Sequence, residues 1–255
     1  MRKQNRGYES LLDTFPALLP LAALIAIVFL AFLTQTVTGF GAMLIAMALG
    51  AFLFPVQQLL AWFLPLVITL STYLVIRHWR SIDFSLLLKA ILPGMTAGLL
   101  LGQVLFWNLE ADALKKLLGV MIAALALREL LKSPSAETKT TPLLPWSVAA
   151  GFVHGIFATG GPVLVYALNT QKLDKGSFRS TLAMVWLIMG IALCIPLMSE
   201  GALSGDDLPV IALLIGVLTI SIVIGEWLHH RVNAALFTRS IQLLLVVAGV
   251  MLCFQ

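Results

Sequence analysis

The sequence predicts an all-α polytopic membrane protein with two homologous halves, and three observations lead to this fold class. Of the 255 residues, 60% are hydrophobic and 11% are charged, whereas a soluble domain carries about 25% charged residues. Apolar runs fill most of the chain, and many reach the roughly 20 residues that a membrane-spanning helix needs. Two of these runs are interrupted by glycines at corresponding positions of the halves, which predicts broken helices.

The first half, residues 1–131, is predicted to hold one broken segment and three helices. Its first apolar run covers about 16–54 and breaks near 38–41. Because Glu9 and Asp13 precede this run and no small-residue cleavage site follows it, we expect an uncleaved first helix, not a signal peptide. Three further helices are expected at about 58–76, 84–106 and 113–131.

A polar segment at 132–142, rich in Ser, Thr, Pro and charge, separates the halves and is predicted to be a cytoplasmic linker. The second half, residues 143–255, opens with an apolar run at 143–170 that breaks near 158–162, and helices are expected at about 179–198, 207–228 and 234–254. The two arms of 143–170 are expected to have about 14 residues each, about 21 Å, which is too short to span a bilayer core of about 30 Å. The whole chain then has about eight full spans and up to ten membrane segments.

The halves resemble each other in order and spacing. Residues 32–48 align with 152–168 at an offset of 120, and Trp62 and Gly102 align with Trp186 and Gly225 after a small gap. Loops rich in Lys and Arg are expected in the cytoplasm, and the acidic loop at 200–207 outside. This arrangement predicts inverted repeats. The side of the N-terminus, and whether 16–54 spans twice or re-enters, stay open because Arg2, Lys3 and Arg6 favour a cytoplasmic tail.

Both breaks are candidate binding sites for an anion. A helix that begins inside the membrane directs free amide N–H groups and the positive end of its dipole toward any neighbouring cavity. The second break offers Gly160, Gly161 and Pro162 with the Thr159 hydroxyl, and we expect a leucine at Gly160 to block it without unfolding the protein. The predicted substrate-binding residues are Thr38, Gly39, Gly41, Gln35, His154, Thr159, Gly160, Gly161 and Pro162.

Other chemistry is not indicated. No nucleophile motif, phosphate-binding loop or metal-ligand spacing occurs, so no enzyme, cofactor or metal site is predicted, and so apolar a chain is not expected to bind nucleic acid. Several glycines (Gly94, Gly98, Gly102, Gly151 and Gly155) are expected to allow close helix packing. The same explanation remains an alternative for the breaks. Trp62 and Trp186 are expected to pack in the core.

The chain resembles the TauE/SafE family of sulfite exporter-like permeases. The resemblance rests on the two repeats, on the breaks at Val37–Ala42 and His154–Val163, and on the polar segment at Arg77–Asp83. It implies a multi-pass carrier of the bacterial inner membrane for sulfite, a sulfonate or another small organic anion. The first break departs from the fuller Gly-Gly-Gly pattern of the family, so we favour the second as the binding tip.

The leading hypothesis is therefore a secondary anion exporter, with the small anion and the lipid bilayer as its partners. The alternative is an intramembrane scaffold or assembly protein whose glycines serve helix packing. Substrate identity, transport direction, coupling ion and self-association into a homo-oligomer are left open.

Overall fold

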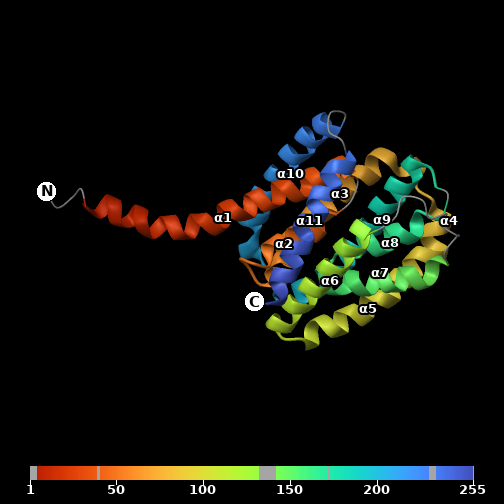
Figure 1. The fold of residues 1–255 in the computed structure, drawn as a ribbon, viewed down its shortest axis with the longest axis horizontal. Helices are drawn as coiled ribbons and strands as arrows, with labels where there is room; N and C mark the ends of the chain where they lie inside the picture. Colours follow the sequence, from red (N-terminus) through yellow and green to blue (C-terminus); the bar gives the residue numbers. More distant parts are fainter. Residues whose placement is uncertain (1–4, 39–40, 132–141, 172, 230–233, 255) are drawn as a thin grey trace.

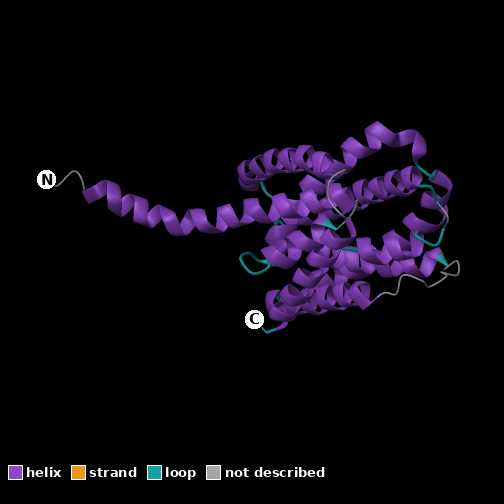
Figure 2. Cartoon of the chain, turned by 45° about the horizontal axis from the view of Figure 1, so that its top comes forward, coloured by secondary structure: helices purple, strands orange, loops and turns teal. Residues whose placement is uncertain are grey.

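The computed structural model describes residues 5–38, 41–131, 142–171, 173–229 and 234–254. Across these residues the chain is helical, with no strand (Figures 1 and 2). The first helix begins at Asn5, earlier than the predicted start near 16, and its N-terminal part projects beyond the bundle (Figure 1). Most of the predicted linker, residues 132–141, lies outside the described residues.

The first half contains the predicted broken segment and three helical segments, and the middle one includes a π-helical stretch. In chain order its elements are α1 (Asn5–Thr38), α2 (Ala42–Gly50), α3 (Val56–His78), η1 (Trp79–Ser81), α4 (Phe84–Leu86), η2 (Leu87–Ile91), α5 (Leu92–Asn108) and α6 (Ala111–Leu131). The side-chain carboxylate of Asp83 accepts a hydrogen bond from the Leu86 amide and caps α4.

The second half repeats this plan. Its elements are α7 (Leu143–Phe157), α8 (Gly161–Leu168), α9 (Lys175–Ser199), η3 (Gly205–Asp207), α10 (Leu208–His229) and α11 (Ala234–Cys253). The predicted break in 143–170 is confirmed, but the arms are unequal. With 15 residues and 8 residues, α7 and α8 are about 22 Å and about 12 Å long. Neither arm can cross a bilayer core.

Five helical segments of the described chain are long and apolar enough to cross a membrane. They are Leu19–Thr36, Val56–Ser81, Phe84–Asn108, Gly176–Ser199 and Gly205–Leu228. The helix α6 carries charged side chains at both ends, and the described apolar part of α11 is shorter, Ile241–Cys253. The fold is thus that of a polytopic membrane protein, with five clear spans where we expected about eight.

Glycines bring several helices into close contact, as predicted. A Cβ atom added at Gly102 of α5 would lie 3.1 Å from the Cα of Gly155 in α7, and one at Gly151 would lie 2.7 Å from the Cα of Met95. The helices α6 and α11 meet in the same way at Gly119 and Gly249. These glycines therefore serve packing, since any side chain would push the backbones apart.

The helix pairings of the two halves correspond. The helix α5 packs on α7 and α10 packs on α1, while α3 packs on α9 and α6 on α11. The aligned glycines follow this pattern, because Gly102 lies against α7 and Gly225 of α10 lies against Thr36 of α1.

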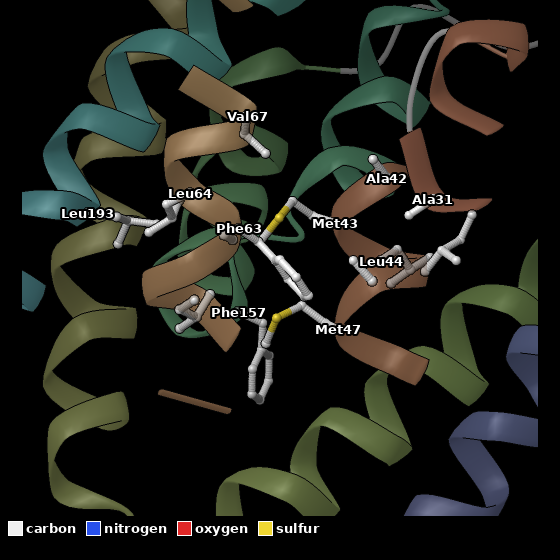
Figure 3. Packing of buried hydrophobic residues seen from close by; sticks show 14 of the residues in the cluster. Ala31, Ala42, Met43, Leu44, Met47, Phe63, Leu64, Val67, Phe157 and Leu193 are labelled. Atoms are coloured by element: carbon white, nitrogen blue, oxygen red, sulfur yellow. The ribbon is translucent and has the colours of Figure 1, made fainter. Parts of the chain in front are cut away.

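The two short helices lie in the interior of this bundle. Every residue from Ala42 to Ala48 of α2 is buried, and a helix that is apolar all round is suited to such a position. The side chains of Met43 and Met47 extend from α2 toward Phe63 of α3 (Figure 3). Long helices instead expose apolar side chains on their outer faces, for example Leu100 and Val104 on α5. The start of each short helix is thereby kept inside the protein.

Candidate anion-binding site between the helix breaks

The first break places a glycine before α2. Gly41 has a φ of 102°, a left-handed conformation that glycine adopts without steric cost. Its carbonyl accepts the first helical hydrogen bond, from the Ile45 amide at 3.1 Å. The Ala42 amide donates to Oε1 of Gln35 at 3.1 Å. The side chain of Gln35 thus satisfies one of the free amides at the start of α2.

The second break is built differently. Ala158, with a φ of 55°, is the left-handed residue at the end of α7, and its amide donates to the His154 carbonyl at 2.7 Å. The helix α8 restarts at Gly161 with Pro162 in its first turn and has no side-chain cap. Proline suits this position because its missing N–H would have no helical partner. The first-turn amides of Gly161 and Val163 are left without acceptors inside the helix.

The two breaks meet at one small cavity. Most of the predicted site residues line this cavity, namely Gln35, Gly41, His154, Thr159, Gly161 and Pro162. The rest of the wall was not predicted and consists of Met43, Leu44, Val67, Ala158 and Trp186. Its volume is about 40 Å³, where about 10–15 Å³ is enough for one water molecule. The cavity can therefore hold a few waters or one small ion.

His154 is the most unusual polar group of this wall. Its side chain is 2% exposed, and neither ring nitrogen has a hydrogen-bond partner. The ring stacks on Trp186, with centroids 5.4 Å apart and planes at 20°. Buried polar groups in proteins are nearly always paired, because an unpaired one costs about 1–3 kcal/mol. The unpaired imidazole beside the cavity is therefore a candidate ligand-binding group.

The Thr159 hydroxyl is a second donor on this wall, and its acceptor is weak. The residue is 2% exposed, and its hydroxyl contacts Sδ of Met121 at 3.9 Å. A thioether is a weak acceptor, so this hydroxyl can turn toward a better one in the cavity. His154, Thr159 and the first residues of α8 thus place candidate donors around one cavity.

The two adjacent glycines of the second break have different surroundings. A Cβ atom at Gly161 would meet only Cζ2 of Trp186, at 3.7 Å, whereas one at Gly160 would lie 2.9 Å from the Cβ of His154 and 3.1 Å from the Ala150 carbonyl carbon. Gly160 is buried and does not line the cavity. The expectation that Gly160 tolerates leucine is therefore wrong, because the side chain would force α8 away from α7.

The remaining predictions for the site concern Thr38, Gly39 and Trp186. Gly39 and the side chain of Thr38 lie outside the described residues. Trp186 packs against the core, as expected, and it also lines the cavity and stacks on His154. Its alignment with Trp62 marked it as a repeated position, but only the packing of α9 against the break reveals this role. The apolar wall residues Met43, Leu44 and Val67 gave no sequence signal.

The charge of the cavity favours anions. None of the described residues that line it is acidic, and two helix starts, those of α2 and α8, contribute the positive ends of their dipoles. Among the described residues, no group of three or more His, Cys, Asp or Glu side chains could hold a metal ion. The geometry thus offers donors without a competing carboxylate.

Comparison with known proteins gives one match. The model of the family described as sulfite exporter TauE/SafE matches residues 24–252, nearly the whole chain. Neither the search of curated proteins nor that of solved structures returned a match.

Proposed function

Because the chain belongs to the sulfite exporter TauE/SafE family, we propose that it is a secondary transporter that exports sulfite, a sulfonate or another small organic anion. The family is one of membrane transporters of the sulfite and anion exporter type, and the protein is a multi-pass inner-membrane protein. Our proposal adds the site, which is the cavity between the two helix breaks. The observation that carries it is the buried, unpartnered imidazole of His154 on the cavity wall.

The binding chemistry follows from the donors of this wall. An oxyanion with several acceptor oxygens would receive hydrogen bonds from His154, the Thr159 hydroxyl and the first amides of α8. Such bonds to a charged acceptor are each worth about 1.5–3 kcal/mol. The cavity volume of about 40 Å³ suits an ion of sulfite size, since each water needs about 10–15 Å³. A sulfonate with an organic tail would require the cavity to widen.

Transport requires this site to open to each side in turn. Broken helices at a repeat interface are the usual place for such a site, with one repeat moving against the other. The corresponding helix pairings of the halves support this arrangement. Outward movement of an anion is favoured by an inside-negative potential, by about 2.3 kcal/mol per charge per 100 mV. Export would then need no coupling ion.

The packing alternative accounts for a different set of glycines. Gly102, Gly151 and Gly155 are in van der Waals contact with neighbouring backbones, whereas Gly41 and Gly161 border the cavity. A scaffold protein would need the first set and would gain nothing from an unpaired buried histidine. This favours a carrier.

Flux of sulfite into proteoliposomes tests the proposal. We expect uptake that saturates with sulfite concentration, is competed by sulfonates according to their size, and is absent from protein-free vesicles. Saturable uptake of none of the anions in a panel of sulfite, sulfate, taurine and acetate would contradict the carrier and support the scaffold alternative.

The proposed orientation has its own test. In a variant lacking Cys194 and Cys253, Asp206→Cys should react with an impermeant thiol reagent added outside cells, and Ser81→Cys should react only after the membrane is opened. Both positions are exposed. Labelling in the opposite order would reverse the orientation derived from the basic loops.

A further inference from the structure

A second cavity adjoins the first at Gln35. It lies among α1, α3, α9 and α10, and its polar lining consists of Gln35, Thr36, Tyr73, Arg179 and Glu226. Its volume is about 20 Å³, half that of the central cavity. Gln35 lines both cavities. The two cavities therefore share one lining residue, and its Oε1 atom accepts the hydrogen bond from the Ala42 amide at the start of α2.

The charges of this second cavity distinguish it from the central one. Arg179 is the one cationic side chain in its described lining and Glu226 the one acidic side chain, and both are exposed. A guanidinium stays charged and presents parallel N–H donors that match the oxygens of an oxyanion. The described lining of the central cavity, in contrast, contains no Lys, Arg, Asp or Glu side chain. An anion would thus meet the guanidinium first and the donors of the central cavity afterwards.

We propose that this second cavity is an entrance chamber in which Arg179 captures the oxyanion, with Gln35 separating it from the central site. This inference rests on the proposed transport function. Glu226 opposes capture, because its carboxylate repels the anion and attracts the same guanidinium. A site on a transport path must release its ion as well as bind it, and a carboxylate beside the arginine keeps the occupancy of the chamber short.

The chamber belongs to the basic side of the protein. Tyr73 precedes the segment Arg77–Arg80, Arg179 closes the basic segment 172–179, and Glu226 precedes His229 at the end of α10. Loops rich in Lys and Arg face the cytoplasm. The chamber would accordingly be the cytoplasmic mouth, where cargo for export is collected.

Close packing holds this mouth in shape. A Cβ atom at Gly225 would lie 2.6 Å from the Cβ of Thr36, so α10 approaches α1 at the level of the chamber. The Thr36 hydroxyl donates to the Phe32 carbonyl at 2.8 Å and is thereby turned back onto its own helix. The polar side chains that remain to interact with a transported ion are those of Gln35, Tyr73, Arg179 and Glu226.

Kinetics of sulfite efflux from the basic-loop side test the chamber. We expect Arg179→Gln to raise the KM at least tenfold with little change in the maximal rate, and Arg179→Lys to recover part of the affinity. Glu226→Gln should lower the KM. Added salt should raise the wild-type KM more than that of Arg179→Gln, because salt screens the guanidinium charge. The matched control is Arg77→Gln, which removes an equal charge from an exposed position outside the chamber lining.

Two outcomes would overturn the chamber while leaving the transport proposal intact. The first is a KM in Arg179→Gln equal to that of Arg77→Gln. The second is loss of folded protein in both Arg179→Gln and Glu226→Gln, with rescue by the charge exchange Arg179→Glu/Glu226→Arg, since this would mark a structural ion pair. Absence of flux from the wild type would instead contradict the proposed function itself.

Discussion

The two helix breaks share a backbone plan but differ in how their polar groups are satisfied. At the first break, Gln35 accepts a hydrogen bond from the Ala42 amide, so the start of α2 is partly closed by the protein itself. At the second break, α8 has no side-chain cap, and the nearby His154 has no partner at all. Under the proposed function, this difference favours the second break as the binding position and the first as its support.

The two aligned tryptophans, Trp62 and Trp186, also differ in the groups that they contact. Trp62 of α3 donates from Nε1 to Oδ1 of Asp207 at 2.8 Å and contacts Phe54 edge-on. Trp186 of α9 stacks on His154 and lines the cavity. Trp62 thus connects α3 to the segment that holds Asp207, while Trp186 contacts the imidazole of the proposed site. The two aligned positions therefore make different contacts.

Filling the cavity from the second break should have the largest effect. Gly161→Leu is expected to reduce sulfite flux to the level of empty vesicles, because a side chain there extends past Trp186 into the cavity. Its Cβ meets nothing closer than 3.7 Å, so the melting temperature should stay near that of the wild type. Flux and thermal unfolding in detergent are the two measurements.

Two glycine controls accompany this variant. Gly205→Leu, at an exposed position with no atom within 4 Å of the added Cβ, should leave flux unchanged. Gly160→Ala should lower the melting temperature, because its Cβ meets α7. Wild-type flux in Gly161→Leu would remove the cavity from the transport path.

Replacing the unpaired imidazole should give the next largest effect. His154→Phe keeps a ring against Trp186 but removes both nitrogens. Losing a hydrogen bond to a charged ligand, about 1.5–3 kcal/mol, predicts a loss of affinity of about 10- to 100-fold, at about 1.4 kcal/mol per factor of ten.

The His154→Phe variant should lose affinity for the anion without losing thermal stability. The empty protein no longer buries an unsatisfied polar group, whose cost is about 1–3 kcal/mol, so the melting temperature of His154→Phe should be equal or higher. A variant that loses both flux and folded protein would show that His154 is structural.

The first break should respond more weakly, and two substitutions separate its roles. Gln35→Leu removes the acceptor of the Ala42 amide, a capping contact worth about 1 kcal/mol, and should lower flux a few-fold. Gln35→Glu keeps an acceptor for that amide but directs a carboxylate toward the anion. Gln35→Glu should therefore have a higher melting temperature than Gln35→Leu but a lower flux. If the variant with the higher melting temperature also has the higher flux, Gln35 does not face the substrate.

Local sequence signals predicted the positions of the breaks and of the packing glycines well. Glycine and proline act on the nearest turn of backbone, so interruptions at Gly41 and Gly161 could be located from the chain alone. Two features could not. The left-handed residue of the second break is Ala158, an alanine and not a glycine, and its amide donates to the His154 carbonyl of α7. Trp186 comes to the site only because α9 is near α7, and such contacts between distant segments have no local signature.

The smallest effect on transport is expected at Trp62, the counterpart of Trp186. Trp62→Phe removes the hydrogen bond to the Asp207 carboxylate, and a bond to a charged group contributes about 1.5–3 kcal/mol, so the melting temperature should fall by several degrees while flux is unchanged. Trp186→Phe should lower flux and leave the melting temperature near that of the wild type, because phenylalanine keeps a ring against His154 but a smaller one. Asp207→Asn in the Trp62→Phe background should add little to the loss, since the shared bond is already gone. If Trp62→Phe lowers flux as much as Trp186→Phe does, the two halves contribute equally to the site, and the division between a supporting break and a binding break fails.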